Sequence, residues 1–117
     1  LPVEKVGENK VFYVYYLQVG DPRAYVSKWK NLMKKLERDG IAPSSYGLRE
    51  IMAGGENNET HVIWMGYSSM EELAENYNAT GSSETVAAFV ADAASMRSIS
   101  RTSIFTQLTL DTAEIFE

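Results

Sequence analysis

The sequence predicts one α+β domain in which two helices cover one face of a four-stranded antiparallel sheet. Four segments have the apolar, β-branched and aromatic composition of strands, and helical periodicity occupies the two longer intervals between them. No linker divides the 117 residues, which suffice for one core. We therefore expect a single domain over residues 1–117, with a polar lead at 1–9 and an acidic tail at 111–117.

The first strand and the first helix have the clearest signals. Residues 11–19, VFYVYYLQV, predict a strand in which eight of nine residues are apolar or aromatic. After it, Asp21 is a favourable N-cap, and Pro22 suits the first helical position because its missing N–H is not needed there. The helix is expected to end at Asp39 and Gly40, since glycine readily adopts the positive φ that follows a helix.

A β-hairpin is expected next. Strands over residues 45–53 and 60–67 flank the turn GGENNE at 54–59, whose Gly and Asn residues tolerate positive φ. Two strands joined by so short a connection pair antiparallel. Arg49 and Glu50 interrupt the first of these strands with charges, a feature typical of a sheet edge.

The second helix is expected to be split in two. Ser69, with Glu72 three residues later, forms the capping-box pattern of a helix start. Residues 81–83, Gly-Ser-Ser, interrupt the helix, which then resumes with an apolar face that includes Phe89. The last strand is predicted over residues 101–110, RTSIFTQLTL, and Arg101 opens it.

The element order β-α-β-β-α-β is that of a ferredoxin-like fold, which leaves one sheet face uncovered. Here both sheet faces are apolar. One face is expected to carry Tyr13, Tyr15, Leu17, Ile63 and Met65, and the other Phe12, Val14, Tyr16, Trp64, Ile104 and Leu108. Either set, left in water, would exceed the apolar patch usual on a monomer. We therefore expect a homodimer packed sheet to sheet, although the pattern does not decide which face meets the helices.

At this point the chain resembles a known family. The element order, the two-sided apolar sheet and the split helix after HVIWMGYSSMEELAENY resemble the dimeric α/β-barrel superfamily over roughly residues 10–110. That superfamily includes antibiotic biosynthesis monooxygenases, haem-degrading oxygenases and stress-responsive proteins. Haem-using relatives generally place the ligand histidine on the second helix, where this chain has residues 76–78, Asn-Tyr-Asn. The resemblance therefore implies no haem, and we expect no cofactor.

Composition excludes several classes of partner. The net charge of -5 argues against nucleic acid, which requires a basic surface. No apolar run approaches the roughly 20 residues of a membrane-spanning helix, so we expect no membrane partner. The absence of cysteine excludes disulfides and thiolate metal ligands. The chain begins at Leu1 without an initiator Met and with a polar lead, which favours an exported (periplasmic or secreted) protein over a cytoplasmic one; trimming of a tag is the alternative.

Two polar residues are candidates for chemistry. His61 is the only histidine, and it is the candidate general base because imidazole titrates near neutral pH. Its alternative interpretation is a structural histidine at a strand end, and one His without an acidic or Cys cluster predicts no metal site. Arg49 is the candidate holder of a carboxylate or enolate oxygen, with a charged sheet edge as the alternative.

Aromatic residues on the predicted strands are candidates for a ligand pocket. Tyr13, Tyr15, Trp64 and Tyr67 would form walls around a flat apolar or aromatic molecule. Their alternative interpretation is packing in the core and in the dimer interface.

Two functions follow from these candidates. The first is a small-molecule-binding module without evident catalytic machinery. The second, implied by the resemblance, is a monooxygenase-like enzyme that needs no cofactor and oxidises an aromatic or quinol-type substrate, with His61 as its base.

Overall fold

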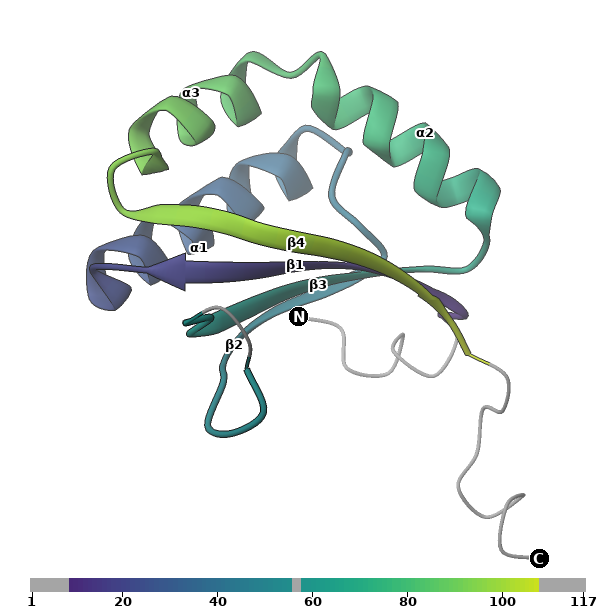
Figure 1. The fold of residues 1–117 in the computed structure, drawn as a ribbon. Helices are drawn as coiled ribbons and strands as arrows, with labels where there is room; N and C mark the ends of the chain where they lie inside the picture. The colour runs from purple at the N-terminus through teal and green to yellow at the C-terminus, as the bar shows by residue number, and fades with distance from the viewer. Residues whose placement is uncertain (1–8, 56–57, 108–117) are drawn as a thin grey trace, which may run out of the picture.

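The computed structural model describes residues 9–55 and 58–107, and the predicted ferredoxin-like order is confirmed with the second helix split in two (Figure 1). Residues 1–8 of the polar lead, the acidic tail and the predicted end of the last strand at 108–110 lie outside the described residues, and export stays a prediction. The elements are β1 (Val11–Val19), α1 (Pro22–Arg38), β2 (Ser45–Glu50), β3 (His61–Tyr67), α2 (Met70–Gly81), α3 (Glu84–Ala93) and β4 (Arg97–Thr106).

The four strands form one antiparallel sheet in the order β2-β3-β1-β4. The sequence-predicted hairpin is the pair β2–β3, and the charged strand β2 lies at an edge as expected. All three helices lie on one side of the sheet in Figure 1, so the opposite side is uncovered within one chain. Within the described residues, no helix is both long and apolar enough to cross a membrane.

Local signals place the helix ends. The Asp21 carboxylate accepts a hydrogen bond from the Ala24 N–H at 3.3 Å, and Pro22 occupies the first turn. Gly40 has a φ of 76°, the left-handed conformation that a side chain disfavours. Ser69 caps α2 by accepting the Glu72 N–H at 3.1 Å. The Glu72 carboxylate accepts hydrogen bonds from the Ser68 N–H, the Ser68 hydroxyl and the Ser44 hydroxyl. These bonds tie the start of α2 to the residue before its cap and to the loop that precedes β2.

Strand β4 begins at Arg97, four residues earlier than the sequence predicts, and it contains an irregularity. The β1–β4 register shifts between Tyr16 and Leu17, which pair with Arg101 and Ile99 and leave Ser100 as an extra residue. This bulge reverses the alternation of side chains. Ile99 and Ile104 consequently both share the face of Leu17 and Tyr13, whereas the sequence predicted Ile104 on the face of Trp64.

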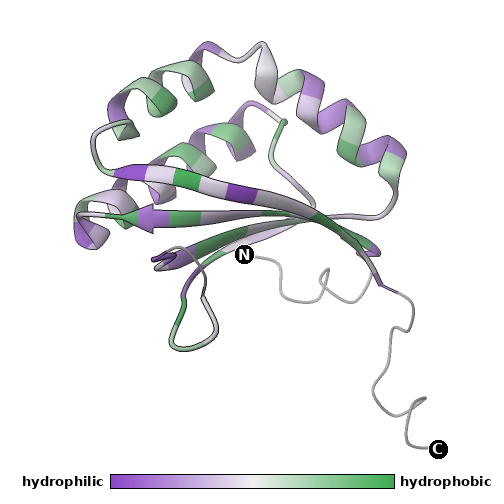
Figure 2. Cartoon of the chain, in the orientation of Figure 1, coloured by the Kyte–Doolittle hydropathy of each residue, from purple (hydrophilic) through white to green (hydrophobic). Residues whose placement is uncertain are grey.

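The face that meets the helices carries Leu17, Val19 and Ile63, which pack with Tyr25, Trp29 and other residues of α1 into the main core. A smaller cluster of Val11, Tyr67 and Leu73 continues it beneath α2. The uncovered face carries Phe12, Val14, Tyr16, Trp64 and Phe105. Figure 2 shows hydrophilic positions (purple) between hydrophobic ones along edge strand β4.

Candidate functional site

A cavity of about 200 Å³ lies between the helices and the sheet. Because an apolar cavity of about 150 Å³ holds benzene, this space suits a small aromatic molecule. Strands β1, β3 and β4, the three helices and the loop after α1 contribute its walls. The lining is largely apolar and includes Tyr15, Trp29, Leu32, Met33, Leu36, Pro43, Ile63, Met65, Val86, Phe89, Val90 and Ile99.

Two of the four polar residues in this cavity are engaged by the protein itself. The Asn76 amide donates to the Ile41 carbonyl at 2.6 Å and accepts from the Tyr67 hydroxyl at 2.6 Å. The Thr80 hydroxyl donates to the Asn76 carbonyl at 3.0 Å, within its own helix. These bonds fix α2 against the sheet. The other two polar lining residues each interact with a phenol, Tyr15 with Tyr13 and Arg97 with Tyr25.

Arg97 brings a positive charge to this aromatic space. Its guanidinium carbon lies 5.5 Å from the centroid of the Phe89 ring and 5.7 Å from that of Tyr25, within the range of cation–π attraction. Within residues 9–55 and 58–107, no carboxylate forms an ion pair with Arg97. The cavity therefore holds a cation whose counter-charge the described residues do not supply.

The buried phenols of this region act as neutral groups at ordinary pH. Burial, reinforced by the neighbouring Tyr13, raises the pKa of Tyr15 to about 12. Burial likewise raises the pKa of Tyr67 and of Tyr25, although Arg97 opposes the rise at Tyr25. The Tyr25 hydroxyl is buried beside the Arg97 guanidinium, whose positive charge favours the ionised phenol.

The raised phenol pKa predicts a loss of stability in alkali. Below pH 10 Tyr15 is protonated in both the folded and the unfolded chain, so its contribution is complete. Between pH 10 and 12 the unfolded chain ionises first, and the free energy of unfolding is expected to fall. Urea denaturation at pH 9, 10.5 and 11.5 measures this fall, and it should be smaller in Tyr15→Phe. An equal fall in that variant would assign the alkaline loss to other groups.

Three of the four residues predicted to form an aromatic pocket lie together, and the fourth does not. Tyr15 lines the cavity, and the ring of Tyr13 packs against it at a centroid distance of 4.9 Å. Tyr67 is buried on the same side of the sheet. Trp64 lies on the uncovered face, where its ring meets Phe12 at 6.3 Å, so it does not belong to the same pocket.

A glycine makes room for Trp64 on that face. A Cβ atom at Gly47 would stand 2.6 Å from the indole Cε2, so the ring lies directly over the backbone of β2. Trp64 pairs with Gly47 on β2, and because Gly47 has no side chain, the indole can lie flat on the uncovered face.

His61 and Arg49 are brought together, but away from the cavity. Both line an open groove between the start of α1 and strand β2. His61 is buried, with its Nδ1 atom 2.7 Å from the Thr60 hydroxyl. A base at His61 would therefore not reach a ligand enclosed by Tyr15 and Trp29. Within the described residues, no group of three His, Cys, Asp or Glu side chains is arranged to hold a metal ion.

The sequence reading missed Arg97 because it began the last strand at Arg101. The alternation of polar and apolar residues in RSIS, 97–100, could have indicated that the strand starts earlier. The bulge at Ser100 interrupts this alternation, so the sequence pattern does not connect RSIS with the residues that follow. Phe89 was predicted on an apolar helix face, but its contact with Arg97 depends on how α3 lies over the sheet.

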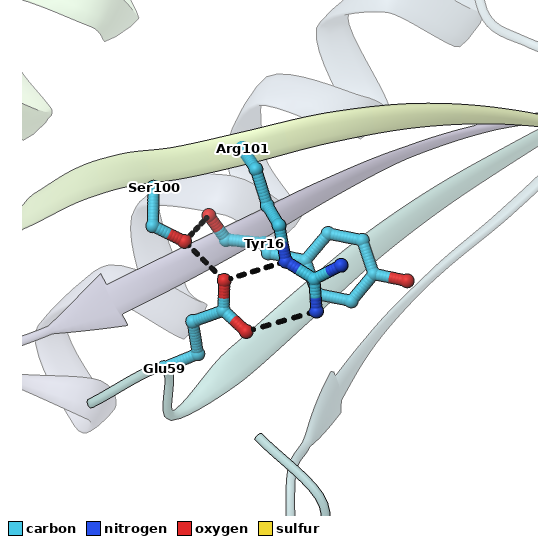
Figure 3. Close-up of polar contacts among 4 residues, drawn as sticks. All are labelled: Tyr16, Glu59, Ser100 and Arg101. Atoms are coloured by element: carbon cyan, nitrogen blue, oxygen red, sulfur yellow. Dashed lines mark hydrogen bonds and ion pairs between the residues drawn. The ribbon is translucent and has the colours of Figure 1, made fainter. Parts of the chain in front are cut away.

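A charged cluster lies on the uncovered face (Figure 3). The buried Glu59 carboxylate accepts hydrogen bonds from Arg101 Nε at 3.0 Å and Nη2 at 3.1 Å. The Ser100 hydroxyl lies within hydrogen-bond reach of Glu59 and of the Tyr16 carbonyl. The guanidinium stacks on the Tyr16 ring, 3.7 Å from its centroid. The extra residue of the bulge thus supplies a hydroxyl to this ion pair.

Comparison with known proteins finds likeness in structure only. No protein-family model matches the chain. No curated protein sequence matches it either. Among solved structures, SnoaB, a cofactor-independent oxygenase from Streptomyces nogalater, aligns at a TM-score of 0.60 and 12% identity, over 86% of this chain and 95% of that one.

Two further solved structures agree with this result. HapK from Hahella chejuensis aligns at a TM-score of 0.62 and 11% identity, over 84% of this chain and 92% of that one. A dimeric protein of unknown function and ferredoxin-like fold from Bacteroides fragilis NCTC 9343 aligns at 0.55 and 10% identity, over 82% and 94%. The chain thus has the ferredoxin-like α+β fold of these structures.

Proposed function

We propose that this protein is a homodimeric small-molecule-binding module whose ligand is a flat aromatic molecule with one anionic oxygen group. The observation that carries the proposal is Arg97, a cation without a carboxylate partner in the described chain, beside an otherwise aromatic and aliphatic cavity. A carboxylate or phenolate on the ligand would supply the missing charge.

The chemistry of the cavity favours such a ligand. Burying an anion without a partner is costly, whereas the planar guanidinium of Arg97 donates paired hydrogen bonds to a carboxylate. The Tyr15 phenol stays neutral at ordinary pH and so adds no negative charge that would repel the anion. Aromatic walls from Trp29 and Phe89 offer stacking and edge contacts to a ring.

Binding rather than catalysis is the better supported function. None of the described side chains that line the cavity is a histidine or a carboxylate. Proton abstraction requires an acceptor within hydrogen-bond reach, and Tyr15, with its raised pKa, serves as a donor. The likeness to an oxygenase concerns the fold alone, and one fold hosts many functions.

The uncovered sheet face supports assembly as a homodimer. Val14 lies at its centre and is buried beneath its neighbours, while Phe12, Trp64 and Phe105 form a contiguous apolar surface around it. Two such faces packed about 10 Å apart would remove this surface from water. The Bacteroides fragilis protein of the same fold is itself described as dimeric.

The ligand proposal is tested with benzoate and benzamide, which share a shape and differ in charge. We expect benzoate to bind more tightly by isothermal titration calorimetry. Arg97→Met should weaken benzoate about 10- to 100-fold, the usual worth of a charge-assisted hydrogen bond, and leave benzamide unchanged. Arg38→Met is the matched control, because Arg38 is exposed at the end of α1 and lies outside the cavity. Equal affinities for the two probes, or an Arg97→Met variant that binds benzoate normally, would contradict the proposal.

A further inference from the structure

A second concave site lies on the surface, between the first turns of α1 and the edge of the sheet. This groove, of about 560 Å³, is within the size range of small-molecule sites. It shares no lining residue with the internal cavity. Its walls are Pro22, Arg23, Val26, Ser27, Lys30, Leu48, Arg49, Glu50 and His61.

The charge of this groove is opposite to that of the protein. The chain as a whole has a net charge of -5, yet the groove gathers Arg23 and Lys30 against the single carboxylate of Glu50. Arg49 also borders the groove, but it pairs with Val62, a position of the uncovered face, so its side chain is directed to the other side of the sheet. In the part of the chain that the structure describes, neither Arg23 nor Lys30 forms an ion pair. Like charges that share a concave surface repel one another, and a bound anion would relieve that repulsion.

His61 adds an imidazole to the buried side of the groove. Its side chain is only 6% exposed, so its orientation is fixed by the surrounding strands. The Thr60 hydroxyl accepts the Val19 N–H at 3.0 Å and lies 2.7 Å from His61 Nδ1. One hydrogen lies between this hydroxyl and Nδ1, and either group can donate it. No described residue forms a hydrogen bond with Nε2, which leaves that nitrogen for a molecule in the groove.

We propose that this groove binds the phosphate group of a small molecule. A phosphate monoester carries close to two negative charges at neutral pH and has three acceptor oxygens, which match the guanidinium of Arg23 and the ammonium of Lys30. A single carboxylate would leave part of this positive charge uncompensated. Val26 and Leu48 give the groove an apolar wall for the organic part of such a ligand.

The test is an NMR titration with inorganic phosphate and with phenyl phosphate. Saturable shifts are expected at the Ser27 and His61 amides. Tighter binding of phenyl phosphate would identify a phosphorylated organic molecule as the ligand, and equal binding would identify free phosphate. Shifts that do not saturate with either probe would overturn the proposal.

Charge variants separate a built site from general attraction. Lys30→Gln and Arg23→Gln should each raise the Kd for phenyl phosphate at least tenfold. Both residues are exposed, so the fold should tolerate the changes, as a thermal melt will verify. Lys34→Gln is the matched control, since Lys34 is an exposed lysine of the same helix that lines neither this groove nor the cavity. If Lys34→Gln weakened the binding of phenyl phosphate as much as Lys30→Gln, the loss would reflect net charge and the groove would not be a built site. Phenyl phosphate also matches the ligand class proposed for the cavity, so binding to the groove is followed at Ser27 and His61, which line the groove and not the cavity. Arg97→Met should leave the saturable shifts of these two residues unchanged, which keeps this test separate from that of the cavity.

Discussion

Phe105→Asp is expected to convert the dimer into monomers. Phe105 lies on the uncovered sheet face, paired with Phe12, and 48% of it is exposed in the single chain. In a symmetric dimer the substitution occurs twice in one interface. Each buried carboxylate without a partner costs several kcal/mol, so the dimer dissociation constant should rise more than about a thousandfold.

The neighbouring residue provides a matched control. Ile104 is 49% exposed, but it lies on the helix side of the sheet with Tyr13. Ile104→Asp introduces the same charge one residue away and should leave the dimer intact. Native mass spectrometry distinguishes the outcomes, since the wild type and Ile104→Asp should have about twice the mass of one chain, 13.1 kDa. A monomeric wild type, or a dimeric Phe105→Asp variant, would refute face-to-face packing.

The features that could be predicted from the sequence are those set by neighbouring residues. Asp21 and Pro22 fix the start of α1 because a carboxylate cap and a preset φ act within one turn. Gly40 ends the helix, and Ser83 restarts α3 after Gly81, through equally local geometry. With those boundaries given, the order of strands and helices, and hence the fold, follows.

The candidate site depends on contacts that local signals do not encode. Both faces of β1 are apolar, so only the packing of the helices decides that Tyr15 faces a cavity and Tyr16 does not. A one-residue bulge at Ser100 changes the face of every residue beyond it, which moved Ile104. His61 and Arg49 did come together, but in a groove closed by α1, which the strand pattern could not reveal.

The last prediction concerns the ion pair on the uncovered face, where the two partners are unequally buried. The Glu59 side chain is 0% exposed, whereas that of Arg101 is 38% exposed. Removing Glu59 leaves a guanidinium that water can reach and that still stacks on Tyr16. Removing Arg101 leaves a fully buried carboxylate that keeps its hydrogen bond to the Ser100 hydroxyl but loses the opposite charge. We therefore expect Arg101→Met to lower the free energy of unfolding by about 4 kcal/mol and Glu59→Ala by about 2 kcal/mol.

The decisive measurement is which variant, Arg101→Met or Glu59→Ala, loses more free energy of unfolding. Urea denaturation at one fixed protein concentration gives both values, because the stability of a dimer depends on concentration. Asp92→Ala is the control for an ordinary surface ion pair: Asp92 meets Lys28 at 3.2 Å with 70% of its side chain exposed, and its loss should cost less than about 1 kcal/mol. If Glu59→Ala proved the more damaging change, the stacked arginine rather than the buried carboxylate would be the group that depends on its partner. In that case desolvation of Glu59 would not be what makes the pair important to the sheet.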